Sequence, residues 1–166
     1  MTERTNVSIP AAAVAEFGIR QLQARYIDAV WRRDYESFGD CFALDAEWRI
    51  AGRVVKGRDG AIAFIKQMMA DFRSIFIVLG TPILSVGDGV ASGRTYFTAR
   101  NTFKDGSPFG PIGVYYERFV LEEETWRFKW RLFQTHYAGP PDLSGTYNAN
   151  ADYGPPPGMP PRDAQG

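Results

Sequence analysis

Side chains able to stabilise an anion or move a proton alternate along the C-terminal half of the chain. Alternate residues of a β-strand share one face. Within three predicted strands, such side chains therefore share a face: Arg94, Tyr96, Thr98 and Arg100 in the first, Tyr115 and Glu117 in the second, and Arg131 in the third. Arginines that enter an enclosed pocket stabilise developing oxyanions. A tyrosine among them could act as an acid or base, because nearby positive charge lowers the pKa of a phenol.

Alternation along the last predicted strand leaves two arrangements open. Its apolar row is Trp126, Phe128, Trp130 and Leu132, and its cationic row is Arg127, Lys129 and Arg131. The cationic row could line a wet cavity while the tryptophan row forms a subunit interface. Alternatively, the cationic row faces solvent and the tryptophan row is the core. Buried cations need partners in either case.

The general base has several candidates. They are Glu117, His136 and a tyrosinate from Tyr26, Tyr96 or Tyr115. The simpler role for Glu117 is an ion pair with Arg100 or Arg131, and alternation points His136 away from the pocket. Three further rings would favour a flat aromatic guest, namely Trp31, Trp48 and Phe133.

Helical periodicity comes first along the chain, and strand patterns follow it. Residues 16–33 carry an apolar stripe at helical spacing, and Asp34 is typical of the N-cap of a second helix over 35–42. Short strands at 46–50 and 54–55 precede a third helix after Gly57. The later strands are expected at 75–84, 90–103, 113–121 and 126–137. Three helices followed by hairpins predict an α+β fold: helices against a strongly curved, mainly antiparallel sheet.

Bulk composition limits the possible partners. The 166 residues carry no formal net charge, so nucleic acid and anionic membrane surfaces are not expected partners. No apolar run is long enough for a membrane span, and the N-terminus has no signal-peptide pattern, so we expect a cytoplasmic protein. One cysteine and one histidine argue against a disulfide framework and a zinc site. We expect no metal and no cofactor.

The ends of the chain differ from its centre. We expect an N-terminal extension over residues 1–13, a folded domain over 14–138 and a Pro/Gly-rich tail over 139–166. The tail has a composition typical of disorder. In the alternative, Leu143, Tyr147 and Tyr153 lie over the pocket mouth or a neighbouring subunit.

Several segments resemble the SnoaL-like branch of the nuclear transport factor 2-like superfamily. They are the stretch 24–38, Asp45-Ala46-Glu47-Trp48, the stretch 56–62, Glu117-Arg118-Phe119 and Trp126-Arg127-Phe128, and the resemblance covers about residues 14–140. It implies a cone-shaped α+β barrel whose curved sheet encloses the pocket and whose outer face makes oligomer contacts, so we expect a homo-oligomer, trimer or dimer. It also implies pocket positions for Tyr26 and Trp48. It selects the sheet face that holds Arg131 and, on the neighbouring strands, Arg94, Tyr96, Thr98, Arg100, Tyr115 and Glu117.

The resemblance further implies how this chain differs from the eliminating members of the superfamily. Those enzymes use an Asp–His pair. The Asp position corresponds here to Trp31 and the His position to the vicinity of Val78, whereas the pocket arginine is matched by Arg131. The dyad mechanism is therefore not expected in this chain.

The resulting functional hypothesis is a cofactor-independent lyase that acts on a bulky aromatic, phenolic molecule, such as a lignin-derived dimer. It would eliminate water or a one-carbon unit through a quinone-methide-like intermediate. One alternative is an isomerase or cyclase for a steroid-like or polyketide substrate. The other is a small-molecule-binding module without catalysis.

Overall fold

The computed structural model describes residues 10–148 and 159. Its helices are α1 (Ala11–Arg32), α2 (Tyr35–Asp40) and α3 (Gly57–Met69). Its strands are β1 (Phe42–Ile50), β2 (Arg53–Lys56), β3 (Phe72–Leu79), β4 (Ile83–Val86), β5 (Val90–Phe103), β6 (Pro108–Phe109), β7 (Ile112–Glu122), β8 (Thr125–Ala138) and β9 (Thr146–Tyr147). Within the described residues, no helix is long and apolar enough to cross a membrane.

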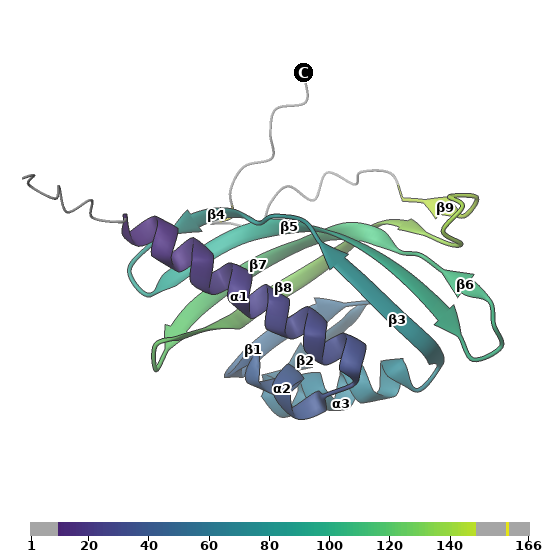
Figure 1. Ribbon diagram of the computed structural model, residues 1–166, viewed down its shortest axis with the longest axis horizontal. Helices are drawn as coiled ribbons and strands as arrows, with labels where there is room; N and C mark the ends of the chain where they lie inside the picture. The colour runs from purple at the N-terminus through teal and green to yellow at the C-terminus, as the bar shows by residue number, and fades with distance from the viewer. Residues whose placement is uncertain (1–9, 149–158, 160–166) are drawn as a thin grey trace, which may run out of the picture.

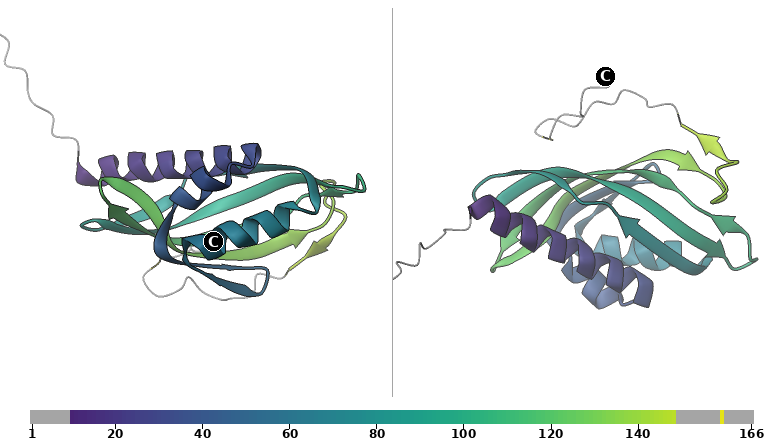
Figure 2. Two further views of the ribbon diagram at one scale, coloured as in Figure 1. Left: turned by 90° about the horizontal axis from the view of Figure 1, so that it is seen from below. Right: turned by 45° about the horizontal axis from the view of Figure 1, so that its top comes forward.

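The strands form one curled sheet whose main order is β2-β1-β8-β7-β5-β3. Strands β1 and β8 pair in parallel, and the other paired strands of the described residues are antiparallel. Figure 1 shows α1 crossing one side of this sheet, with α2 and α3 beside β1 and β2. The two views of Figure 2 show the same curvature. The predicted α+β cone with three helices against a curved, mixed sheet is confirmed.

Helix α1 buries one stripe against the sheet. Ile19, Leu22, Tyr26 and Val30 recur at three- and four-residue spacing, and each is at most 2% exposed. Gln23 lies on the same stripe and is also buried. The helix ends at Arg33, whose positive φ of 56° ends the helical geometry. Its guanidinium donates to the carbonyl oxygens of Met69 and Phe72, which ties the end of α1 to the α3–β3 connection.

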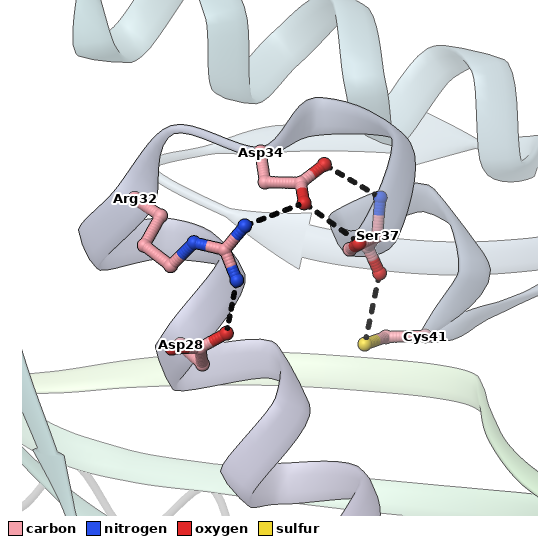
Figure 3. Close-up of polar contacts among 5 residues, drawn as sticks. All are labelled: Asp28, Arg32, Asp34, Ser37 and Cys41. Carbon is pink, nitrogen blue, oxygen red and sulfur yellow. Dashed lines mark hydrogen bonds and ion pairs between the residues drawn. The ribbon is translucent and has the colours of Figure 1, made fainter.

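The short helix α2 begins where the sequence predicts. The carboxylate of Asp34 accepts hydrogen bonds from the backbone N–H of Ser37 at 3.1 Å and from its hydroxyl at 2.8 Å (Figure 3). These bonds lower the pKa of Asp34. Helix α2 ends two residues before the predicted boundary, because Phe42 already belongs to β1 and is buried.

The predicted strand over 75–84 is two strands in the structure. Gly80, Thr81 and Pro82 separate β3 from β4. Proline has no N–H to donate to a ladder, so the chain leaves the sheet there. Both strands then pair with the long β5, which spans the predicted residues 90–103.

Part of the C-terminal segment is ordered. Thr146 and Tyr147 of β9 pair with β8, and the Tyr137 hydroxyl accepts from the Gly145 N–H at 2.9 Å. Met159 packs against Val114 and Tyr116. The prediction of disorder is therefore wrong for residues 139–148. Residues 1–9 and Tyr153 lie outside the described residues, and the domain boundaries stay a prediction.

A β-bulge in β8 changes which side chains enter the cone. Phe119 pairs with Phe128, but the preceding Arg118 pairs with Trp130, so Lys129 is the extra residue of β8. Before the bulge, Trp126 and Phe128 face the core, where they are 8% and 0% exposed.

Beyond the bulge, the residues that face the core are Arg131 and Phe133, whereas Trp130 and Leu132 pack with Val114 and Tyr116 on the outer face. The prediction of one continuous apolar row from Trp126 to Leu132 is wrong, because strict alternation ends at the bulge. The homo-oligomer stays a prediction. Trp126 and Phe128 are buried in the core of the subunit, so they cannot be part of its predicted interface.

Candidate functional site

The cone holds a partly open cavity of about 210 Å³. Its wall comes from α1, α3, β1, β3, β5, β6, β7 and β8 and is mainly aliphatic and aromatic. Polar atoms enter this wall from a few side chains, including Tyr26, Trp48, Asn101, Tyr115 and Thr135. A concave, mainly apolar cavity with few polar groups is the usual form of a small-molecule site.

A buried polar network lies behind the tyrosines. Arg131 Nε donates to Glu117 Oε1 at 2.8 Å, and both side chains are 0% exposed. The second carboxylate oxygen accepts from the Thr95 hydroxyl at 2.8 Å and from Gln23 Nε2 at 3.1 Å. Gln23 also donates to Thr95 at 2.8 Å. These bonds compensate the burial of the carboxylate, which would otherwise be strongly unfavourable.

Aromatic rings surround the Arg131 guanidinium. Its carbon lies 3.9 Å from the ring centroid of Tyr115, 4.0 Å from that of Phe128 and 4.5 Å from that of Tyr26. Such cation–π contacts gain strength when water is excluded. Burial alone would lower the pKa of Arg131, but the charge of Glu117 and the two tyrosines raise it above its ordinary value. The group is therefore a permanent cation beside two phenols of the cavity wall.

Burial favours the neutral form of Tyr115. Burial raises its pKa well above the ordinary value, Tyr26 raises it further, and Arg131 opposes both effects. The expectation that an adjacent arginine would lower the pKa of this tyrosine is wrong, because desolvation of the phenolate outweighs the attraction of the guanidinium. A neutral phenol donates a hydrogen bond or a proton and is not a resting base.

Six of the predicted site residues meet in one place. Tyr26, Trp48, Tyr115 and Phe133 line the cavity. Glu117 and Arg131 form the ion pair behind it. The simpler role considered for Glu117, an ion pair with Arg131, is the one that the structure contains.

Four predicted site residues lie on the outside. Tyr96 is 53% exposed and Trp31 is 51% exposed, and Thr98 and Arg100 are exposed as well. The antiparallel register explains the error for β5, since Tyr115 of the inner face pairs with Thr95 and residues directly opposite one another share a face. The odd-numbered residues of β5 therefore point inward. Trp31 instead contacts the ring of Phe76, at 4.7 Å between centroids.

The last two predicted catalytic residues also lie away from the cavity wall. Arg94 is buried, but it pairs with Tyr116 on the outer face of the sheet. His136 is the extra residue of a second irregularity in β8, because Ile112 pairs with Tyr137 and Gly113 with Thr135. Neither residue lines the cavity.

Sequence reasoning missed Gln23 and Thr95 of the network and Asn101 of the wall. Gln23 had a detectable signal, because it stands four residues after Ile19 and three before Tyr26, on the apolar stripe of α1. Thr95 and Asn101 required the register of β5, which alternation alone does not supply.

Metal ligands are not clustered in the described part of the chain. Residues 10–148 and 159 contain no group of three or more His, Cys, Asp and Glu side chains that could hold a metal ion. Among the described residues, those that form the cavity wall include no carboxylate and no imidazole.

Solved structures share this fold at low sequence identity. A type 2 hexachlorocyclohexane dehydrochlorinase, LinA, has a TM-score of 0.73 and 18% identity over 89% of this chain and 97% of its own. A provisionally assigned scytalone dehydratase from Novosphingobium aromaticivorans has a TM-score of 0.73 and 17% identity over 82% and 93% of the two chains. A type 3 LinA from Novosphingobium barchaimii has a TM-score of 0.72 and 17% identity over 83% and 96%.

No curated protein gives a significant sequence match. Residues 13–131 match the SnoaL-like domain family. This match extends from α1 to the buried arginine of β8 and so includes the ion pair and most of the cavity wall. The chain belongs to the family of SnoaL-like domains.

Proposed function

We propose that the chain is a cofactor-independent lyase that removes water from a compact phenolic substrate. The observation that carries this proposal is the neutral phenol of Tyr115, which lines an apolar cavity with the Arg131 guanidinium carbon 3.9 Å from its ring centroid. A proton donor of this kind assists the departure of a hydroxyl group. The buried cation lowers the cost of the phenolate that forms transiently.

The cavity volume limits the size of the substrate. A cavity of about 150 Å³ holds one benzene molecule, and this cavity measures about 210 Å³. One ring with short substituents fits better than the two-ring dimer considered from the sequence. The named activities of the structural neighbours, a dehydrochlorinase and a provisionally assigned dehydratase, are eliminations and support the same reaction class.

In the proposed reaction, Tyr115 is both the proton donor to the leaving hydroxyl group and the base that removes a proton afterwards. Tyr115 gives its proton to the benzylic hydroxyl, and the C–O bond breaks with its electron pair going to oxygen, so that water leaves. A hydroxyl group on the ring donates electron density to the carbon that becomes electron-poor, which gives it quinone-methide character. The Tyr115 phenolate then removes a proton from the adjacent carbon, and the C–H electron pair completes the double bond. Where the adjacent carbon carries a hydroxymethyl group, its O–H proton can be removed instead, and the carbon–carbon bond breaks to release formaldehyde.

The test is turnover of 1-(4-hydroxyphenyl)ethanol, with 4-vinylphenol as the expected product, followed by chromatography and mass. A phenolic two-ring dimer serves as the size comparison. Tyr115→Phe should lower the rate by roughly 10²- to 10⁴-fold, the usual contribution of a positioned acid or base. Tyr96→Phe is the matched control, because that tyrosine is 53% exposed and does not line the cavity. Equal rates in the wild type and Tyr115→Phe would contradict the proposal.

A second candidate is binding without catalysis. It is favoured by one observation: within residues 10–148 and 159, no carboxylate or imidazole lines the cavity. A binding module would retain saturable, stoichiometric affinity for phenols and form no product from any of them. Product formation that depends on Tyr115 excludes this candidate.

A further inference from the structure

The outer face of the sheet carries a small hydrophobic cluster of its own. Val114 and Tyr116 of β7 form this cluster with Met159, and Trp130 and Leu132 of β8 pack against it. The cluster is separate from the main core, which fills the cone. We call the four strand residues the outer patch. A satellite cluster of this kind is typical of a surface that a long loop or a terminal segment covers.

The outer patch has a local cover. A free face of an antiparallel sheet is in contact with water, yet Val114 is 2% exposed and Tyr116 is 1% exposed. Tyr96, the strand partner of Val114, is 53% exposed, although residues directly opposite one another share a face. The helices cannot supply the cover, because they lie on the concave side of the sheet (Figure 2). The cover therefore ends between Val114 and Tyr96.

Met159 lies on this face from outside the sheet and is itself 8% exposed. A thioether is flexible and polarisable and makes favourable contacts with aromatic rings, and Tyr116 and Trp130 bring two such rings to the patch. Prolines stand on both sides of Met159 in the sequence, at 155–157 and 160–161. Because proline restricts the backbone before any contact forms, a proline-rich segment loses little conformational entropy when it docks.

The connection from β9 is long enough for Met159 to reach the patch of its own subunit. The Asn148 N–H donates to the His136 carbonyl oxygen, which places Asn148 beside β8. From His136 back to Trp130 is about 20 Å of extended strand. The chain from Asn148 to Met159 can span up to about 36 Å. The contact therefore needs no second subunit.

We infer that the outer patch is the docking site of the chain's own C-terminal segment, and that Met159 is the anchor of this segment. A second copy cannot bind to the patch while Met159 occupies it. Subunit contact through this face therefore requires release of the segment. The inference is independent of the proposed function, because the outer patch lies on the opposite side of the sheet from the cavity.

The test is the rate at which hydrogen peroxide oxidises the Met159 thioether in the native, full-length protein, followed by peptide mass spectrometry. Oxidation should be about 10-fold slower than in the urea-unfolded chain, because the buried thioether is reached only when the segment is released. Met69, a core residue that is 1% exposed, reports any global unfolding. Equal rates for Met159 in the native and unfolded chains would overturn the inference, and this comparison needs no variant.

Two variants assign the protection to the outer patch. Tyr116→Ala removes a ring against which Met159 packs, so Met159 should be oxidised about 10-fold faster while Met69 stays protected. Tyr96→Ala is the matched control, because it removes an exposed tyrosine from the same face of the sheet and should leave the rate unchanged. Unchanged protection in Tyr116→Ala would show that Met159 is buried elsewhere.

A dilution series distinguishes the chain's own segment from that of a second copy. Protection of Met159 within one subunit should stay constant as the protein is diluted. Protection that is lost on dilution, together with a fall in the mass measured by light scattering, would mean that the segment docks on a second copy. That result would contradict the inference.

Discussion

Glu117 and Arg131 stand directly opposite each other on β7 and β8 and form an ion pair of 2.8 Å with no solvent exposure on either side chain. Glu117 accepts a hydrogen bond from Gln23 of helix α1. Arg131 lies against the rings of Tyr26 and Tyr115, which line the cavity. Each side of the pair has its own compensation: hydrogen bonds for the carboxylate and aromatic faces for the guanidinium. The site is therefore polar at its base although its wall is mainly apolar.

Loss of the carboxylate charge should destabilise the fold strongly. Glu117→Gln leaves the Arg131 guanidinium buried without a counter-charge, and breaking one side of a buried pair costs about 3–5 kcal/mol. Urea unfolding followed by circular dichroism measures the change. The control is Glu16→Gln, which removes an exposed ion pair with Arg20 at 3.6 Å and should cost under about 1 kcal/mol. Equal stability of Glu117→Gln and Glu16→Gln would contradict the stabilising role of the buried ion pair.

Tyr115 should stay protonated in alkaline solution. Burial raises its pKa well above the ordinary value of 10.0, so its phenolate should be missing from an ultraviolet titration of the native protein near pH 10. Subtracting the titration of Tyr115→Phe from that of the wild type isolates this group. The difference should show no phenolate until the pH is well above 10 or the protein unfolds. Ionisation below pH 10 would show that the arginine outweighs burial.

Cys41 should be unreactive in the native state. The thiol is 1% exposed, donates to the Ser37 carbonyl oxygen at 3.4 Å, and burial raises its pKa from 9.0 to about 11. Since the thiolate is the nucleophile, iodoacetamide at about pH 8 should modify only the unfolded protein. Mass spectrometry with and without denaturant measures this, and rapid native modification would contradict the burial.

The same shift predicts a pH dependence of stability. Because the folded thiol has the higher pKa, its contribution to stability is fully present below about pH 9 and is lost as the pH rises toward about 11. Cys41→Ala should lose this part of the alkaline decline, while other titrating groups act equally in both proteins. Parallel stability curves for the two proteins over this window would refute the shift.

Gly113 should not tolerate a methyl group. A Cβ atom there would lie 2.4 Å from the Gln134 carbonyl oxygen and 2.7 Å from the ring of Phe133, so β8 or the cavity wall must move. Overpacking of this kind costs about 1–3 kcal/mol. Thermal unfolding of Gly113→Ala measures the loss.

The matched control for this change is Gly60→Ala in α3. Its Cβ would meet only Val55, at an ordinary 3.5 Å, and alanine favours a helix over glycine, so this variant should be at least as stable as the wild type. Similar stability losses in both variants would show that the contact of Gly113 with Phe133 is unimportant.

The sequence by itself determined the classes of element and most of their positions. The stripe of α1, the Asp34 cap and the full length of β5 depend on local rules, namely helical spacing, side-chain capping and strand propensity. Together with the resemblance, these rules also brought Tyr26, Trp48, Tyr115, Glu117 and Arg131 to one site. Gln23 was within reach of the same reasoning, since a polar residue on an apolar stripe signals a buried partner.

Only the tertiary structure decided which side of the sheet each strand residue faces. A side chain changes face with every one-residue shift of register, and one bulge at Lys129 moves the inward positions of β8 from even to odd numbers. Register and bulges depend on pairing between distant strands, which no local pattern encodes. For this reason Arg131 and Asn101 line or support the cavity, whereas Tyr96, Thr98 and Arg100 lie outside it.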